Sequence, residues 1–428
     1  MKPVLLISLF IFCASILSAQ TATPPAGDGT SGNPYQIAAL DNLYWVTQNT
    51  GSWGSYIIQT ADIDADSTSG WDSGSGFYPI GNSTTAFTGS YNGQGHTITH
   101  LFINRSGQYN GLFGWIGGGS VRNLHLESVQ VTGGDLCTGG MIGYLYYSAT
   151  ATNCTSTGTV AGTFDVGGLI GGLDAFSVTS NCYSGGSVTG ANGGIGGLIG
   201  TASRNSVIKN CYSTSSVAGT NSAFNIGGLI GGANTVYDTN CYSNGHVTGT
   251  GTTTKVGGLI GMQLYVTTID CFWDTLTSGL DTSAAGTGKS SAEMKQQSTF
   301  TNAGWDFSTI WSISPLINNG YPYLEAHPPT AVREYAAAEP ASLALLQNYP
   351  DPFNPTTAIQ FTVGKDARTI VRVFDILGRD VATLYDGFAR TGTTYSVTFD
   401  GSRCPSGVYL YSIENGNQRL VRKMVMLK

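Results

Sequence analysis

Charged side chains are sparse in the middle of this 428-residue sequence, and their spacing decides whether they could do acid–base chemistry. An enzyme acting on polysaccharides would gather carboxylates, or a carboxylate with His, Lys or Arg, on one outward face. The charged residues between 111 and 273 instead fall at different positions of an internal repeat: Arg122, Glu127, Asp135, Asp165, Asp174, Arg204, Lys209, Asp238, Lys255 and Asp270. Arg122 and Lys209 share one position, but their repeats are not adjacent. We therefore predict no catalytic residue.

Three aspartates near the N-terminus resemble the start of a calcium-binding loop. Asp62, Asp64 and Asp66 alternate as such a loop requires, but Ser67 replaces the expected glycine and no Glu occupies the twelfth position. In a strand the same alternation would put all three carboxylates on one solvated face, which is the interpretation we favour over calcium binding.

The histidines give no better metal site. His96 and His100 flank an expected strand, and His125 falls in an outward column of the repeat. None has a partner at metal-ligand spacing, and the chain contains no His-Glu-x-x-His sequence. We predict neither a metal site nor a cofactor.

Aromatic residues at one repeat position are the strongest candidates for ligand binding. An outward aromatic row could stack on sugar rings, although the same row could simply cover the flank of the domain. We predict a ligand-binding row at Tyr183, Tyr212, Tyr242 and Phe272.

The elements that would position these residues repeat with a period of about 29 residues. Each repeat holds three short segments rich in Val, Thr, Ser and Gly, which favour strands and disfavour helices. The first segment carries a glycine before an apolar pair, at Gly111, Gly140, Gly168, Gly197, Gly228 and Gly258. The third carries valine at Val131, Val160, Val188, Val217 and Val247.

The second segment places its side chains on defined faces. In Val121 to Leu126, the residues Val121, Leu124 and Leu126 must point inward, so Asn123 sits at a bend. Aligned with Leu124, the inward column holds Cys154, Cys182, Cys211, Cys241 and Cys271. Aligned with Asn123, a side-chain amide ladder holds Asn153, Asn181, Asn210 and Asn240.

Eight cysteines raise the alternatives of disulfides or a metal site. Stacked cysteines in adjacent coils have parallel Cβ vectors, which suit disulfide geometry poorly, and their thiolates would form a line rather than a tetrahedron. We favour a buried ladder of free thiols, with partial oxidation as the alternative.

The ends of the chain define the remaining units. Met1 and Lys2 precede an apolar run that ends in small residues, which predicts a signal peptide at residues 1–19. Residues 20–110 are expected to form an N-terminal cap and first coil, with a helical pattern over 34–47, a strand over 56–63 and hairpin-like strands over 87–103. Residues 276–326 should form a C-terminal cap, in which a helix starts at Ser290 and Trp305, Trp311 and residues 321–324 plug the open end.

Together these patterns predict an all-β protein: a right-handed parallel β-helix of about six coils of ~29 residues, with end caps, followed by a small C-terminal β-sandwich. Residues 111–275 form the repeats, 327–343 a Pro- and Ala-rich linker and 344–428 the sandwich. The formal net charge is −7, with no basic stripe, which argues against nucleic-acid binding.

The repeated segments, such as Gly167-Gly168-Leu169-Ile170-Gly171, resemble the GLUG-motif family of bacterial surface proteins. The tail, from Asn348-Tyr349-Pro350-Asp351-Pro352-Phe353-Asn354-Pro355 through Phe374 to Arg379, resembles the type A sorting domain of the type IX (Por) secretion system. Asp351 stands where that family usually has Asn. The tail's resemblance implies outer-membrane export, the secretion machinery as a partner, and a location outside the cell or on the outer-membrane surface.

Three functions remain compatible with these observations. The first, which we favour, is a non-enzymatic adhesin or glycan-binding surface protein whose partner is an extracellular polysaccharide or a cell-surface glycan. The second is a carbohydrate-active β-helix enzyme, a lyase or a hydrolase. The third is a purely structural envelope protein. A convergent acid–base pair would favour the enzyme, and exposed aromatics without such a pair would favour binding.

Overall fold

Parallel strand pairing runs through most of the protein in the computed structural model, which describes residues 20–220, 223–250, 255–315, 317–328, 343–348, 350–391, 394–416 and 418–427. The expected signal peptide and most of the expected linker lie outside these ranges. The chain divides into two compact units, residues 1–331 and 332–428.

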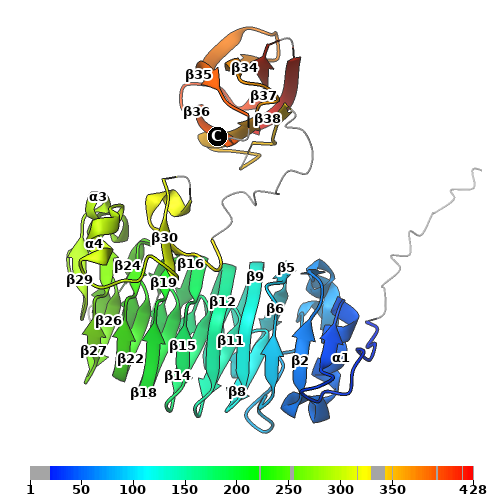
Figure 1. The fold of residues 1–428 in the computed structure, drawn as a ribbon, viewed down its shortest axis with the longest axis vertical. Helices are drawn as coiled ribbons and strands as arrows, with labels where there is room; N and C mark the ends of the chain where they lie inside the picture. Colours follow the sequence, from blue (N-terminus) through cyan, green and yellow to red (C-terminus); the bar gives the residue numbers. More distant parts are fainter. Residues whose placement is uncertain are drawn as a thin grey trace, which may run out of the picture. The chain divides into compact units, whose positions relative to one another are not determined.

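The first unit is a parallel β-helix, which confirms the predicted fold class (Figure 1). We number its coils 1 to 6 by their first strands: β8 (Phe113–Gly117), β11 (Ile142–Tyr146), β14 (Ile170–Asp174), β18 (Ile199–Lys209), β22 (Ile230–Thr239) and β26 (Ile260–Leu264). Each pairs in parallel with the next, as in Ile142↔Ile170 and Ile170↔Ile199.

Further strands form the other walls of each coil. One wall is a separate sheet of short strands: β7 (Tyr109–Asn110), β10 (Cys137–Gly139), β13 (Val166–Gly167), β17 (Gly194–Gly196), β21 (Asn225–Gly227) and β25 (Lys255–Gly257). The remaining strands are β9 (Ser120–Gly133), β12 (Thr150–Gly162), β15 (Val178–Ser180), β16 (Tyr183–Gly190), β19 (Tyr212–Ser213), β20 (Ser216–Gly219), β23 (Tyr242–Ser243), β24 (Val247–Gly249), β27 (Thr267–Ile269) and β28 (Phe272–Asp274).

The glycine column is required by close approach between coils. A Cβ atom at Gly168 would lie 2.2 Å from the carbonyl oxygen of Gly197 and 2.9 Å from Cβ of Ser184. The Ser184 hydroxyl donates to that same carbonyl at 2.6 Å. Any side chain at this position would therefore push neighbouring coils apart. The same crowding is found at Gly140, Gly197, Gly228 and Gly258.

The asparagine corner has a backbone reason. Asn123 and the asparagines stacked on it adopt left-handed φ angles of 51° to 55°, a conformation that Asn tolerates better than most residues. Their side-chain amides donate along the stack, from Asn153 to Asn123, from Asn210 to Asn181 and from Asn240 to Asn210. These three bonds tie successive coils at the bend, and the ladder is interrupted between Asn153 and Asn181.

The five stacked cysteines lie in the interior of the coils, each at most 2% exposed. The cysteines of the described ranges are unbridged. Successive thiols are linked through the backbone, with the amide of Cys211 donating to Sγ of Cys241 at 3.4 Å. Burial raises the pKa of Cys154, Cys211 and Cys271, which keeps these thiols neutral and compatible with an apolar core.

The N-terminal region corrects three expectations: the helix expected over 34–47 begins only at Leu40, the strand expected over 56–63 is divided into two, and the expected hairpins are absent from these described residues. Helix α1 (Leu40–Gln48) caps the end, but β1 (Tyr35–Ile37), β2 (Tyr56–Gln59), β3 (Ile63–Asp64), β4 (Ser90–Asn92), β5 (Thr97–Thr99) and β6 (Phe102–Arg105) all pair in parallel. The strands over 87–103 are therefore not hairpins. They form the coil before coil 1, because β4, β5 and β6 each pair with β9.

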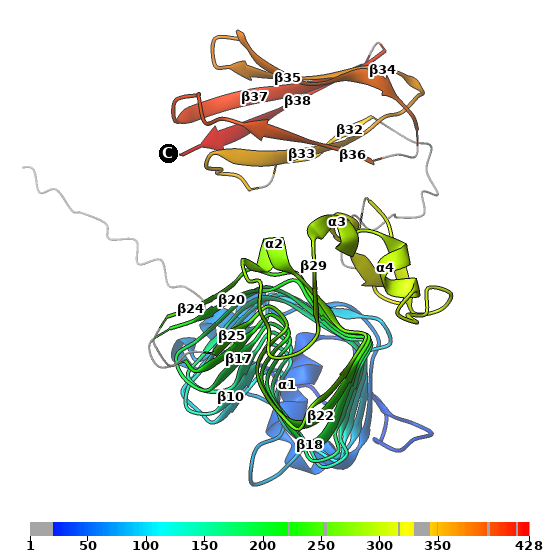
Figure 2. The ribbon, with the colours of Figure 1, turned by 90° about the vertical axis from the view of Figure 1, so that its left-hand side faces the viewer.

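The C-terminal cap is also placed differently from the prediction. The segment with α2 (Thr275–Ser278) and β29 (Thr287–Lys289) closes the open end, where Leu280, Ala284 and Ala285 pack on the core. Helices α3 (Ser291–Met294) and α4 (Gln297–Thr301) and the hairpin of β30 (Trp311–Ile313) and β31 (Pro322–Leu324) lie outside the coil wall instead (Figure 2). The predicted helix start at Ser290 forms a capping box with Glu293.

The second unit contains two antiparallel sheets, as predicted for a small sandwich. One sheet has the order β32 (Ala344–Leu345), β33 (Thr356–Thr362), β36 (Thr394–Asp400). The other has the order β35 (Asp380–Ala389), β34 (Ala367–Asp375), β37 (Gly407–Asn415), β38 (Gln418–Met426). Their shared core includes Phe361, Val371 and Tyr411.

Candidate functional site

The predicted ligand-binding row does stand outside the coil wall, but it is not a free surface. Tyr212 and Tyr242 stack with ring centroids 5.0 Å apart and are 0% exposed, while Tyr183 and Phe272 are 7% exposed. The expectation of an exposed ligand-binding row at Tyr183, Tyr212, Tyr242 and Phe272 is therefore corrected. These rings form a satellite core rather than a surface.

The C-terminal cap supplies the partners of this row. Trp311 packs 6.1 Å from the ring of Tyr242, and Trp305 packs 4.5 Å from Trp311. The phenol of Tyr242 donates to the carbonyl of Pro322 at 2.5 Å. An uncovered apolar row would cost hydrophobic free energy, so the aromatics of the cap cover it instead of plugging the end.

The aspartate triplet makes pairs with histidines. Oδ1 of Asp62 lies 3.2 Å from Nδ1 of His96, and Oδ1 of Asp64 lies 3.0 Å from Nδ1 of His100. Asp64 is exposed, and hydrogen bonding by His100 lowers its pKa. Across the described residues, no group of three potential ligands is close enough to hold a metal ion.

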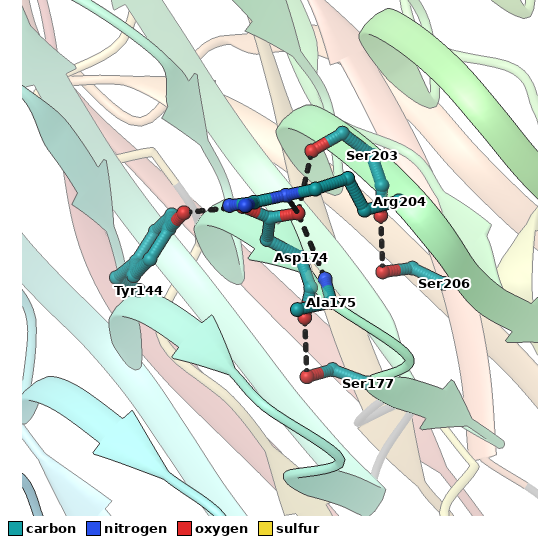
Figure 3. Close-up of polar contacts among 7 residues, drawn as sticks. All are labelled: Tyr144, Asp174, Ala175, Ser177, Ser203, Arg204 and Ser206. Atoms are coloured by element: carbon teal, nitrogen blue, oxygen red, sulfur yellow. Dashed lines mark hydrogen bonds and ion pairs between the residues drawn. The ribbon is translucent and has the colours of Figure 1, made fainter.

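A different cluster brings charged residues together on the outer face of coils 2 to 4 (Figure 3). Asp174 lies at the end of β14, 4% exposed, and receives a hydrogen bond from the phenol of Tyr144 at 2.5 Å. Arg204 of the next coil donates from Nε to Oδ1 at 2.6 Å and pairs through its second nitrogen with Oδ2. The hydroxyl of Ser203 donates to Oδ1 at 2.7 Å.

These contacts fix the charge state of the cluster. Burial works against ionisation of Asp174, but the hydrogen bonds from Arg204, Tyr144 and Ser203 outweigh it and lower its pKa. Burial and the bond to Asp174 raise the pKa of Tyr144, and Asp174 raises that of Arg204. Near neutral pH the cluster is a salt bridge with a neutral phenol, rather than a general acid.

Partly exposed aromatic rings surround this ion pair. Tyr144 and Tyr146 are neighbours on one face of β11, with centroids 5.8 Å apart and planes only 16° from parallel. Trp115 meets Tyr144 at 4.7 Å and Tyr109 at 4.7 Å, and the Arg204 guanidinium lies over the Tyr146 ring at 5.7 Å. We call this surface, made of Tyr109, Trp115, Tyr144, Tyr146, Asp174, Ser203 and Arg204, the Tyr144 face.

The missing side chain of Gly172 leaves the space that the Tyr144 ring occupies. Gly172 pairs with Tyr144 across β11 and β14, and a Cβ on Gly172 would lie 2.5 Å from Cδ2 of that ring. The ring therefore lies over the next coil, where its hydroxyl reaches Asp174. Cys137 borders the same spot, and burial, with the charges of Asp165 and Asp174, raises the pKa of its thiol. It is not a nucleophile in this state.

The corner beside this face exposes bulky aromatics in an unfavourable conformation. Tyr147 has φ 58° and is 66% exposed, and Phe176 has φ 62° and is 61% exposed. Left-handed φ recurs at this corner in the neighbouring coils, as at Ala175, Asn205 and Thr235, so the conformation belongs to the turn of the repeat. The two exposed rings extend the aromatic surface beside the Tyr144 face.

The sequence prediction missed this face because it treated Asp174 and Arg204 as scattered charges. They are adjacent once Ile170↔Ile199 sets the register, which places Gly172 beside Thr201 and Leu173 beside Ala202. A departure from the repeat could have revealed the face. At one position, coils 1 and 2 carry Trp115 and Tyr144, whereas coils 3 and 5 carry Gly172 and Gly232. Two residues further on, coil 2 carries Tyr146, whereas coils 3 and 5 carry Asp174 and Asn234.

Comparison with models of known protein families gives one match in each of the two units. Residues 191–218 match the model of the GLUG motif, and residues 347–427 match the model of the secretion system C-terminal sorting domain. The chain is thus an exported repeat protein, a GLUG-type β-helix followed by a type IX sorting domain. That domain implies interaction with the type IX machinery and delivery to the cell surface or the extracellular space.

Two relatives match about a third of the chain. The chain is 39% identical over 141 residues to halomucin of Haloquadratum walsbyi, covering 32% of this chain and 2% of halomucin. It is 37% identical over 137 residues to a "Putative Gly-rich membrane protein" of Evansella cellulosilytica, covering 31% of this chain and 16% of that protein. The chain therefore spans only a small part of these relatives. No helix among its described residues has the length and apolar character needed to cross a bilayer.

The fold recurs among solved structures. One of them is a crystal structure of a "putative immunoglobulin A1 protease" from Bacteroides ovatus, with a TM-score of 0.58 and 22% sequence identity, covering 70% of this chain and 95% of that chain. At this identity the likeness concerns the fold alone. An enzymatic role stays open.

Proposed function

We propose that this protein is an extracellular glycan-binding protein, and that the Tyr144 face is its binding surface. The observation that carries the proposal is the pair of parallel, partly exposed rings of Tyr144 and Tyr146 beside the Asp174–Arg204 ion pair. Aromatic rings stack on the apolar faces of sugars, while the Arg204 guanidinium, 62% exposed and held in place by the buried Asp174, can donate to hydroxyls.

Export supports the same conclusion. A protein delivered outside the cell meets polysaccharides and cell-surface glycans, and we infer that residues 1–19 direct the first membrane crossing. The sorting domain would then complete the route. Adhesion follows if the exported chain stays attached to the cell while the Tyr144 face holds a glycan.

The electrostatics of the face favour binding over hydrolysis. A glycosidase needs one carboxylic acid that is protonated near neutral pH and a second carboxylate placed across the scissile bond. Asp174 has a lowered pKa and its oxygens are engaged by Arg204, Tyr144 and Ser203, so it meets the first requirement poorly. We therefore place the carbohydrate-active enzyme second.

The test is a glycan array probed with the exported chain and with Tyr146→Ala. We expect at least a tenfold loss of affinity for the retained glycans in this variant, because one of the two parallel rings is removed. Tyr237→Ala is the matched control, since Tyr237 is 48% exposed and pairs with Val207 and Thr267 on the wall beyond the corner that carries Arg204. Retention of no glycan by the wild type, or equal retention by Tyr146→Ala, would reject the proposal. Product analysis on any retained glycan tests the enzymatic alternative.

A further inference from the structure

Two hollows continue the Tyr144 face toward the N-terminal end of the β-helix. One has a volume of about 540 Å³ and is lined by residues that include Tyr78, Asn82, Arg105 and Tyr109. The other, of about 380 Å³, is lined by Tyr44, Trp71, Asp72, Tyr78 and Arg105 among others. Tyr78 and Arg105 border both hollows, so the two adjoin.

Tyr109 connects the larger hollow to the Tyr144 face. Its ring lines the hollow and also meets Trp115 at 4.7 Å and Tyr144 at 5.5 Å. The hollows and the Tyr144 face therefore form one continuous surface of aromatic and polar side chains.

The far end of this surface combines the same residue types as the near end, with the opposite exposure. The Arg105 guanidinium lies 4.3 Å from the centroid of the Tyr78 ring and 2.9 Å from Oδ2 of Asp72, and it donates to the carbonyls of Phe77 and Gly76. Arg105 is 16% exposed and Asp72 59%, whereas Arg204 is 62% exposed and Asp174 6%. The far end therefore offers a ligand hydroxyl the Asp72 carboxylate and the Tyr78 ring, and the near end offers it the Arg204 guanidinium and the Tyr146 ring.

The distance between the two ends sets the size of the ligand. Arg105 belongs to the coil before coil 1, because it pairs with Gly133, and Arg204 belongs to coil 4. Four steps at the parallel-strand spacing of about 4.8 Å cover about 19 Å along the helix axis. One such step is close to the length of a single sugar unit in a linear polysaccharide, so a chain that crosses the coils needs about four units or slightly more.

The charges of the surface select for a neutral ligand. Both guanidinium groups are already paired with carboxylates, and the only charged residue lining the larger hollow is Arg105. The other lining groups are amides and hydroxyls, such as Asn82, Asn104 and Gln108. A uronic acid or sulfated chain would find no unpaired cation here to compensate for its desolvation.

We propose that the ligand is a linear, neutral polysaccharide segment of about four sugar units that lies obliquely across the coils from Tyr78 to Tyr146, rather than a terminal sugar. This inference rests on the proposed function. It adds the ligand's length, its charge and a second contact region at Tyr78 and Arg105.

The test is calorimetric titration of the full exported chain with neutral β-1,4-linked oligosaccharides, from disaccharide to hexasaccharide, and with oligogalacturonides as acidic counterparts. We expect affinity to rise at least tenfold between the disaccharide and the tetrasaccharide and to level off beyond it. Tyr78→Ala should lower tetrasaccharide affinity about tenfold and leave disaccharide affinity unchanged, whereas Tyr146→Ala should weaken both. Tyr56→Ala, another exposed tyrosine, is the control.

The outcomes separate the two proposals. Binding that does not depend on chain length, a Tyr78→Ala variant that behaves like the control, or tighter binding of oligogalacturonides would overturn the present inference and leave the glycan-binding function standing. Absence of binding to oligosaccharides of every length and charge, with a glycan array that is also blank, would reject the function itself.

Discussion

The phenol oxygen of Tyr144 lies 2.5 Å from Oδ2 of Asp174, across the boundary between coils 2 and 3. The two residues are 30 positions apart in the sequence. Tyr144 pairs with Gly172 in the next coil, and Asp174 follows two residues after that glycine. A β-helix turns this sequence separation into direct contact, so residues that depart from the repeat in neighbouring coils can assemble a site while the backbone stays regular.

Glycan binding should depend on pH through Asp174. The hydrogen bonds that lower its pKa favour the carboxylate, so the ion pair is intact at and above the ordinary pKa of about 3.9 and is lost only as pH falls through the lowered pKa of the folded protein. We expect constant affinity from pH 5 to pH 8 and a fall below about pH 4. Asp174→Asn should bind at least tenfold more weakly at pH 7, with little further loss on acidification. A wild-type midpoint near pH 6 would contradict this assignment.

The stability of the β-helix should decrease as pH rises, because of Asp238. This carboxyl is fully buried in the coil interior, and burial raises its pKa from 3.8 to about 7. The folded state therefore binds the proton more tightly than the unfolded chain, and stability falls between about pH 4 and pH 7 by up to about 4 kcal/mol.

The substitution Asp238→Ile tests this directly, because Ile208 occupies the same inward position one coil earlier. We expect the variant to be more stable than the wild type in urea unfolding at pH 8 and to lose the pH dependence. Asp281→Ala, which removes a carboxylate outside the core, is the control and should keep the wild-type profile. Equal pH profiles for wild type and Asp238→Ile would show that Asp238 does not titrate in this range.

The flank cap should depend on Trp311. This side chain is 1% exposed between Trp305 and the rings of Tyr212 and Tyr242. Its replacement by alanine should cost about 3–5 kcal/mol of local packing free energy and open residues 291–324 to proteolysis. Leu276→Ala, at a site 76% exposed, should leave the cleavage rate unchanged. Equal cleavage of both variants would mean that the cap is held elsewhere.

Gly168→Ala should destabilise the β-helix through coil spacing alone. The added Cβ would meet the Gly197 carbonyl at 2.2 Å, which forces a backbone shift costing about 1–3 kcal/mol or more. Gly51→Ala is the matched control, because a Cβ there meets nothing within 4 Å. Urea unfolding midpoints of the two variants provide the measurement, and an unshifted midpoint for Gly168→Ala would contradict the steric argument.

The fold could be predicted from the sequence because the same residue type recurs wherever the backbone of each coil restricts the choice. A glycine recurs where coils approach too closely for Cβ, and asparagine recurs where φ is left-handed. The valine column is in register through Val131↔Val160, Val160↔Val188 and Val188↔Val217. Because these local constraints act at the same position of every coil, the structure of one coil predicts that of the others.

The candidate site was not accessible in the same way. Tyr144, Asp174 and Arg204 belong to no column, and their contact depends on a ring lying over Gly172. The burial of Tyr212 was equally hidden, because the aromatic row and the cap that covers it are separate in sequence, and apolar surface alone does not say what will pack on it.

The position of the cap has a mechanical consequence. The C-terminal cap contacts Phe272 of coil 6 and Tyr242 of coil 5, and from there the chain runs back along the flank of the β-helix. At His327, close to the start of the linker, the imidazole ring centroid lies 4.0 Å from that of His125 in coil 1. A pulling force that enters through the C-terminal unit would therefore load all six coils in shear along their side, rather than peel off the last coil one hydrogen bond at a time.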